Sequence, residues 1–321
     1  MKQAVVFLII CVSLVFSACA TPVSADTQVT HTPLQTQTMR PSQSTVPDLI
    51  ATTPPDEPTH PTAADELQTD VTKTIIVKEA DTLEKEIIPR LCNVFSLSEQ
   101  QVKDVLATAK SDLISDSLSG FRRMEGIIIP GSYQINGETL EDYVNIWISQ
   151  AEQRYAAISA MSTSTNDLKP NEQLALASIV EWECIGDEFE PQAAAVFLNR
   201  ISEGDKLRSC VTVEYALGYQ RPYLTSEDIK VKSDYNTYQV RGLPPGPICA
   251  LDDESLAAAI GKPVDEDLYF FFYDYVQDTM YFFNDYDSFK QAGKESAAKF
   301  KDAFDFDKYD IVEKRQVFCN N

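Results

Sequence analysis

A change of composition near residue 70 decides which part of this chain can fold. From Ala20 to about Asp70 the sequence is rich in Thr, Pro, Ser and Gln and has few aliphatic residues. Such a segment cannot bury enough apolar surface to offset its ordering entropy, so residues 20–70 are expected to be a disordered tether that proline keeps extended. The rest of the chain, about 250 residues, is long enough for one large domain or two small ones.

The segment before the tether has the features of an export signal. One positive residue precedes an apolar run over residues 4–16, which has the length of a signal-peptide core and is too short for a membrane span. The run ends in Phe-Ser-Ala-Cys, which resembles a bacterial lipobox. Residues 1–19 are therefore predicted to be a lipoprotein signal peptide, with lipid on Cys19 anchoring the protein to the extracytoplasmic face of the cell membrane. The alternative is an ordinary signal peptide cleaved near Ala20.

Charge and histidine content limit the chemistry of the folded part. The chain has 49 acidic and 27 basic residues and a net charge of -22. A chain this acidic repels polyphosphate, which argues against nucleic acid as a partner. Both histidines, His31 and His60, lie in the tether, so the folded part is not expected to use Ser-His-Asp or Cys-His catalysis or a His-ligated metal. Chemistry there must rest on carboxylates, tyrosines, lysines or cysteines, and neither a cofactor nor a metal is expected.

The spacing of the cysteines after Cys19 does not match that of a zinc site. Cys92, Cys184, Cys210, Cys249 and Cys319 contain no CxxC pair. Outside the membrane a disulfide is allowed, and one is expected among Cys184, Cys210 and Cys249, with the first two close together. The alternative is that all of these cysteines are buried small hydrophobes.

Hydrophobic patterning predicts a strand–helix–helix–strand unit at the start of the folded part. Residues 72–78 alternate and are β-branched, which is typical of a strand. N-cap patterns favour two helices, over residues 81–91 and 96–110. The second strand is expected at residues 126–129, followed by a turn at Pro130-Gly131.

A longer run of elements is expected after this unit. Thr139 is predicted to cap a helix that buries Trp147, and residues 171–183 form a helix that is apolar on more than one face and should be buried. Further elements are expected as a helix over 191–204, a loop-rich stretch over 207–250, a helix over 254–260, an aromatic hairpin of strands 268–273 and 280–283, and a charged segment 294–321 that is helical at first.

Two glutamates interrupt the apolar helix 171–183. Burial of a carboxylate raises its pKa and allows it to hold a proton near neutral pH, as a general acid must. Glu183 follows Leu176, Ile179 and Val180 at helical spacing, whereas Glu181 has a different helical phase. The alternative is a helix end that carries two solvated acids.

Five segments of the chain occur together in the order typical of one family. They are ALASIVEWE (175–183), AAAVFLNRI (193–201), LRSCVTVEYALG (207–218), DYNTY (234–238) and RGLPPGPI (241–248). They resemble the YceG-like endolytic murein transglycosylases, and MEGIIIPGSYQI (124–135) is similar to the family's leading segment. The resemblance covers about residues 72–289.

The resemblance implies both a fold and an activity. The fold would be α+β, with a small LysM-like βααβ subdomain at 71–135, a YceG-like α+β catalytic domain at 136–292 and a charged tail at 293–321. The activity would be lytic cleavage of peptidoglycan glycan strands between MurNAc and GlcNAc, which leaves a 1,6-anhydroMurNAc end. Expected partners are the glycan strands, the membrane through the Cys19 lipid, and cell-wall synthesis proteins.

The resemblance also carries over site residues. The second glutamate of the IVExE motif is the better match to the family's catalytic residue, which gives Glu183, with Glu181 as the weaker candidate. The residues expected to bind substrate lie in three of the matching segments: Asn199, Tyr235, Asn236, Tyr238, Gly242, Leu243, Pro244, Pro245 and Gly246.

Three departures from the family pattern keep a second function open. Cys210-Val211 stand where the family commonly has Asp-Pro, Thr279-Met280 stand where its hairpin usually includes a histidine, and a lipid anchor would replace the common transmembrane helix. The alternative is a lipid-anchored cell-wall binding protein that has this fold without catalysis.

Overall fold

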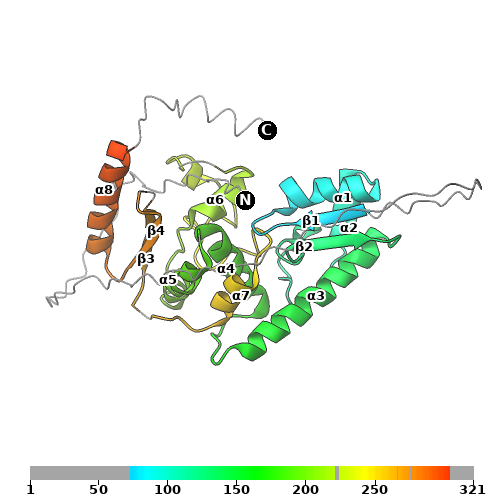
Figure 1. Cartoon of the computed structure of the whole chain (residues 1–321), viewed down its shortest axis with the longest axis horizontal. Coiled ribbons are helices and arrows are strands. Elements are labelled where there is room, and N and C mark those ends of the chain that lie inside the picture. The colour runs from blue at the N-terminus through cyan, green and yellow to red at the C-terminus, as the bar shows by residue number, and fades with distance from the viewer. Residues whose placement is uncertain (1–72, 221–223, 266, 275, 304–321) are drawn as a thin grey trace, which may run out of the picture. The chain divides into compact units, whose positions relative to one another are not determined.

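The described part of the chain begins with a strand, β1 (Lys73–Val77), which pairs in antiparallel fashion with β2 (Gly131–Ile135) further along the chain (Figure 1). The structure is a computed structural model that describes residues 73–303 apart from 221–223, 266 and 275. Cys19, Cys319 and the predicted signal and tether segments lie outside the described residues. Within the described ranges, no helix has both the length and the apolar character needed to cross a membrane.

The predicted strand–helix–helix–strand order is confirmed, with shifted helix boundaries. A π-helical turn, η1 (Leu83–Ile87), leads into α1 (Ile88–Phe95), and α2 (Glu99–Leu106) follows. The caps are Thr82 and Ser98 instead of the expected Asp81 and Ser96. Ser96 has a φ of 57°, so it ends α1 in the left-handed conformation and cannot cap the next helix.

The strand expected at residues 126–129 is wrong. After the 3-10 helix η2 (Gly120–Met124) the chain turns at Gly126, which has a φ of +71°. Ile127 and Ile128 are buried within this turn, and the strand β2 begins only at Gly131, where a turn was expected. An apolar run can satisfy burial without pairing, and the positive φ at Gly126 directs it into the core instead.

The long helix α3 (Leu140–Met161) covers β2 and begins where the sequence indicates. Thr139 and Asp142 form its capping box. Trp147 is fully buried, as predicted, and its ring lies edge-on to that of Tyr133 at 5.7 Å. In Figure 1 this helix runs beside the β1–β2 pair, and it also contacts α7.

Three helices pack around a fourth, α4, in the middle of the fold. α4 (Pro170–Glu183) contacts α5 (Glu190–Ser202), α6 (Cys210–Leu217) and α7 (Asp253–Ile260). The expected burial of α4 is confirmed, because it buries eight consecutive residues from Gln173 to Val180. Helix α6 was missed, since the whole 207–250 stretch was expected to be loop-rich. It lacks a side-chain cap and is buried on all sides, so neither capping nor periodicity indicates it.

The aromatic hairpin is confirmed at the end of the fold. β3 (Phe270–Asp274) and β4 (Thr279–Phe283) pair around Gln277-Asp278, and α8 (Tyr286–Ala303) packs on both strands. This helix runs across residues 292 and 293, where the catalytic domain was expected to end and the charged tail to begin. The 3-10 turns η3 (Asp187–Phe189) and η4 (Asp228–Lys230) complete the described elements.

Glu125 joins the first elements to the centre of the fold. Its Oε1 accepts a hydrogen bond from the backbone N–H of Leu83 at 2.9 Å, and its Oε2 accepts one from the Tyr215 hydroxyl at 2.7 Å. Burial raises the pKa of Glu125 to about 8, although both hydrogen bonds and the charge of Arg122 oppose the rise. The carboxyl is therefore predominantly protonated at neutral pH.

This group should make stability fall as pH rises. Its pKa is about 8 in the folded chain against an ordinary value of 4.5, so the stability gained from the bound proton is complete below about 4.5 and lost as pH rises through about 8. Glu125→Gln keeps an acceptor for the Leu83 N–H, places an NH2 donor beside the Tyr215 oxygen and cannot ionise. Thermal unfolding between pH 5 and 9 should therefore show a shallower decline for this variant than for the wild type.

The control is Glu84→Gln, which changes an exposed acid of the same segment and should leave the wild-type slope unchanged. Parallel declines in the wild type and Glu125→Gln would show that Glu125 binds its proton no more tightly in the folded state.

Candidate active site

Glu183 is the last residue of the buried helix α4 and faces the start of α6. The next residue, Cys184, is extended and ends the helix. The Ser209 hydroxyl donates a hydrogen bond to Oε1 of Glu183 at 2.6 Å. Because α4 is anchored by burial along its length, the carboxylate at its end has a fixed position.

Opposing effects act on the protonation of Glu183. Burial is the largest and raises its pKa above the ordinary value. The Ser209 hydrogen bond, the positive charge of Arg200 and the backbone N–H groups of Cys210 and Val211 lower it, in that order. The site therefore favours the neutral acid by desolvation and also provides partners for the carboxylate.

Arg200 is a fixed cation beside this site. Its Nε and Nη2 donate to the carbonyl of Tyr269 at 3.0 and 2.5 Å, and its Nη1 donates to the carbonyl of Leu207. Burial lowers its pKa to about 10, so the guanidinium stays charged at neutral pH. These contacts with backbone carbonyls also join α5 to the residue before β3 and to the segment that leads into α6.

The segment DYNTY positions Ser209 from behind. The Thr237 hydroxyl accepts a hydrogen bond from the Ser209 N–H at 3.0 Å and lies 2.8 Å from the Thr212 hydroxyl. All three side chains are buried. Ser209 therefore reaches Glu183 from a rigid polar cluster made by α6 and this segment.

Two residues predicted to contact a sugar, Asn236 and Tyr235, are buried within the protein. Asn236 is fully buried, its amide donates to the carbonyls of Ile229 and Val231, and its Oδ1 accepts from the N–H of Tyr238. Tyr235 is buried with its ring 4.8 Å from that of Tyr215. Both residues therefore shape the segment through contacts within the protein, and their role in substrate binding stays a prediction.

Asn199 has a similar position. It is buried in α5, and its amide donates to the carbonyls of Asp265 and Leu268 at 3.0 and 2.8 Å. It therefore fixes the approach to the hairpin. Of the expected polar side chains, Tyr238 remains half-buried, with its hydroxyl 3.2 Å from the sulfur of Cys210.

The expected disulfide is wrong for the described cysteines. Cys92, Cys184, Cys210 and Cys249 are free thiols. Two of these sulfurs have other partners, since the Cys249 thiol donates to the Ser178 carbonyl and Cys210 meets Tyr238. Burial raises the pKa of Cys184 and Cys249 well above the ordinary value, which keeps them as thiols.

The loop Gly242–Gly246 is fixed to two parts of the fold. Just after it, the N–H of Ile248 donates to the Ser178 hydroxyl in the middle of α4 at 3.0 Å. On the other side, a Cβ on Gly246 would lie 2.5 Å from Leu118, and one on Gly126 would lie 2.5 Å from Pro247. Glycine is required at Gly126, where φ is +71° and the neighbour is a proline ring, whereas a side chain at Gly246 would require Leu118 to shift; the loop thus lies against this segment and beside α4.

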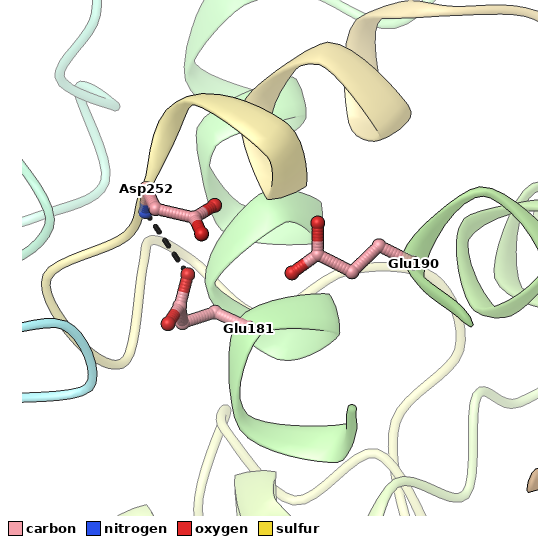
Figure 2. Close-up of side chains that lie close together, drawn as sticks. All are labelled: Glu181, Glu190 and Asp252. Atoms are coloured by element: carbon pink, nitrogen blue, oxygen red, sulfur yellow. Dashed lines mark hydrogen bonds between the residues drawn. The ribbon is translucent and has the colours of Figure 1, made fainter. Parts of the chain in front are cut away.

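Glu181 points to a different place from Glu183, as its helical phase predicts. Its Oε2 accepts a hydrogen bond from the N–H of Asp252 at 2.9 Å, and it lies with Glu190 and Asp252 in a group of three carboxylates (Figure 2). Burial raises its pKa to about 7. A raised pKa therefore does not separate the two glutamates, whereas their hydrogen-bond partners do.

The sequence singles out Glu183 as the candidate acid and does not single out the groups that surround it in the structure. Arg200 and Ser209 lie inside the quoted segments, at AAAVFLNRI and LRSCV, but were not singled out. Their positions in those segments were a usable signal. The carboxylate group of Glu181, Glu190 and Asp252 had no such signal, because its members are spread over three helices.

By its fold and site, the chain is an α+β protein with a half-buried glutamate, Glu183, at the end of the central helix α4. A model of the YceG-like family matches residues 55–295. Because this match covers more than half of the chain, the chain belongs to the YceG-like family. The match begins inside the predicted tether and ends inside α8.

Curated relatives and a solved structure agree with this placement. The chain is similar to two proteins named endolytic murein transglycosylase. The one from Bacillus subtilis (strain 168) is 27% identical over 197 residues, which cover 61% of this chain and 54% of the relative. The one from Streptococcus pneumoniae serotype 2 (strain D39) is 30% identical over 175 residues, which cover 51% and 32%. The chain thus spans about half and about a third of these relatives' lengths.

A crystal structure of a YceG-like protein from Listeria monocytogenes has 24% identity and a TM-score of 0.58, and the match covers 68% of this chain and 75% of that chain. This likeness confirms the α+β fold of the YceG-like type. The LysM-like character of residues 71–135 stays a prediction.

Proposed function

We propose that this chain is a lytic transglycosylase that cleaves peptidoglycan glycan strands between MurNAc and GlcNAc. The observation that carries the proposal is the single glutamate, Glu183, at the end of a buried helix, desolvated and held by Ser209 at 2.6 Å. The names of the relatives from Bacillus subtilis and Streptococcus pneumoniae support the reaction class.

One carboxyl group is enough for this reaction. Protonated Glu183 donates its proton to the glycosidic oxygen, and the bond from that oxygen to C1 of MurNAc breaks. The Glu183 carboxylate then accepts the proton of the C6 hydroxyl of the same sugar as its oxygen bonds to C1. The products are a free GlcNAc hydroxyl and a 1,6-anhydroMurNAc end, and Glu183 is protonated again.

The surroundings of Glu183 suit both halves of this cycle. Desolvation favours the acid that must donate first, while Ser209, Arg200 and the N–H groups at the start of α6 stabilise the carboxylate formed after donation. Asn199 and Asn236 contribute by fixing backbone segments, and Tyr238 with the loop Gly242–Gly246 is the proposed contact surface for the strand.

Hydrolysis and simple binding are the competing functions. A hydrolase ordinarily needs a second carboxylate near the first, and Glu181 is held by Asp252 on another side of the helix. A lipid-anchored binding protein without catalysis is favoured by Cys210, which stands at the start of α6 where the family commonly has Asp.

Replacing the proposed acid should abolish the reaction and leave binding. Glu183→Gln keeps the shape of the side chain and can neither donate a carboxylic proton nor accept one. Turnover of purified glycan strands should fall by roughly 10²–10⁴-fold, the usual contribution of general acid–base catalysis. Glu181→Gln is the matched variant and should lose much less. Products are read by mass as anhydro or reducing ends.

Other results would redirect the assignment. An active Glu183→Gln beside an inactive Glu181→Gln would move the acid by two residues, and activity in both variants would place it elsewhere in the chain. Reducing ends in place of anhydro ends would indicate a hydrolase. A wild type that binds strands and makes no anhydro ends on several peptidoglycans would support the binding protein.

Ser209 should tune the acid. Its hydrogen bond lowers the pKa of Glu183, so Ser209→Ala should raise that pKa further. Since Glu183 must start protonated, activity falls as pH rises through its pKa, and the alkaline limb of kcat/KM should move to higher pH in this variant. Ser202→Ala, which removes a hydroxyl bonded to the Asn199 carbonyl, is the control and should leave the limb in place. A loss of activity with no movement of the limb would reduce Ser209 to a packing role.

Membrane anchoring through Cys19 is a further part of the proposal, supported by the lipobox-like sequence. Metabolic labelling with a clickable fatty acid should mark the wild type and Cys319→Ser, and should fail with Cys19→Ser. Equal labelling of all three proteins would remove the anchor.

A further inference from the structure

Three carboxylates lie close together near the end of α4, in a group that does not include Glu183. Glu181 comes from the last turn of α4, Glu190 from the first residue of α5 and Asp252 from the cap of α7. One carboxylate oxygen of each lies within 4.8 Å of the others. Figure 2 shows the three side chains pointing toward a common space.

Two of the three carboxylates are oriented by the backbone. Glu181 Oε2 accepts from the N–H of Asp252 at 2.9 Å, and Asp252 Oδ1 accepts from the N–H of Ser255 at 2.8 Å. Each of these carboxylates has a second oxygen. The group is therefore preorganised by hydrogen bonds that do not use all of its oxygens.

Glu190 supplies the observation that points to a ligand. It is only 4% exposed, and its Oε2 is buried without a hydrogen-bond partner. In Figure 2 its carboxylate is directed at Glu181 and Asp252. A buried carboxylate oxygen without a partner is costly, so a positive ligand or a proton must compensate it.

The charged groups with the largest effects on Glu181 and Glu190 are acidic. Asp252, Glu181, Asp187 and Glu254 act on Glu190, and Asp252 and Glu79 act on Glu181. Like charges at this separation repel one another strongly in a half-buried place. A cation bound among the three carboxylates would turn this repulsion into attraction.

We propose that Glu181, Glu190 and Asp252 bind a hard divalent cation, Ca²⁺ in particular. The donors are carboxylate oxygens, which Ca²⁺ and Mg²⁺ prefer over the nitrogen and sulfur ligands typical of zinc. Ligands from three separate helices form an irregular set, and Ca²⁺ tolerates irregular geometry better than Mg²⁺ does. No metal was expected from the sequence, because the folded part has no histidine and no CxxC pair, and carboxylates so far apart in the chain form no recognisable spacing.

The cation would have a structural consequence next to the proposed catalytic residue. It would join the end of α4 to the start of α5 and so close the connecting segment 184–189, which begins directly after Glu183. It would also hold the start of α7 against α4. The inference stands on the cluster alone and is independent of the proposed function.

Calorimetry and thermal unfolding test the site directly. The full chain, purified in detergent and treated with EDTA, is titrated with CaCl₂ and, separately, with MgCl₂ and ZnCl₂. Ca²⁺ should bind with a dissociation constant on the order of 10⁻⁴–10⁻³ M and should raise the unfolding temperature. Glu190→Gln should weaken Ca²⁺ binding by at least about tenfold. Glu188→Gln removes one exposed acid from the connecting segment and is the matched control, which should bind as the wild type does.

The proposal expects a calorimetric and thermal response to Ca²⁺ in the wild type and in Glu188→Gln that is lost in Glu190→Gln, with weaker responses to Mg²⁺ and Zn²⁺. An equal Ca²⁺ response in all three proteins would place binding elsewhere and overturn the proposal. No response to any of the ions at 10 mM, together with a higher unfolding temperature for metal-free Glu190→Gln, would mean that a shared proton holds the cluster.

Discussion

The burial of α4 is the constraint on which the rest of this fold depends. A helix that is apolar on several faces must be enclosed, and here α5, α6 and α7 enclose it. Its interior polar group, the Ser178 hydroxyl, accepts the N–H that follows the Gly242–Gly246 loop. The helix therefore positions both the loop beside it and the glutamate at its end. The proposed chemistry depends on this placement of one carboxyl group, which brings Glu183 to Ser209 and to the start of α6.

Two glutamates two positions apart have been given different surroundings. Both are desolvated, and burial raises the pKa of each. Glu183 faces a hydroxyl, a guanidinium and the N–H groups at the start of a helix, so its charged form is provided for. Glu181 faces other acids, so its charged form requires a counter-charge from outside the chain or a proton. This contrast gives the two residues separate proposed roles, in catalysis and in cation binding.

Prediction from sequence was best where periodicity and caps coincide. The start of α3 and both ends of α4 were predicted close to their observed positions, because Thr139 caps the first helix and the second is apolar on several faces. The turn at Gly126 was mistaken for a strand, since an apolar run has the same appearance in either conformation. The surroundings of the candidate site could not be predicted, because the hydrogen bonds that the buried amides of Asn236 and Asn199 donate to distant backbone carbonyls are visible only in three dimensions.

The two glycine contacts of the loop have a mechanical consequence. A Cβ at Gly246 would lie 2.5 Å from Leu118, and one at Gly126 would lie 2.5 Å from Pro247. The loop and the residue that follows it therefore pack against the segment from Leu118 to Gly126 at two points. Because Glu125 directly precedes Gly126, a change in the position of the loop would be felt next to this buried acid.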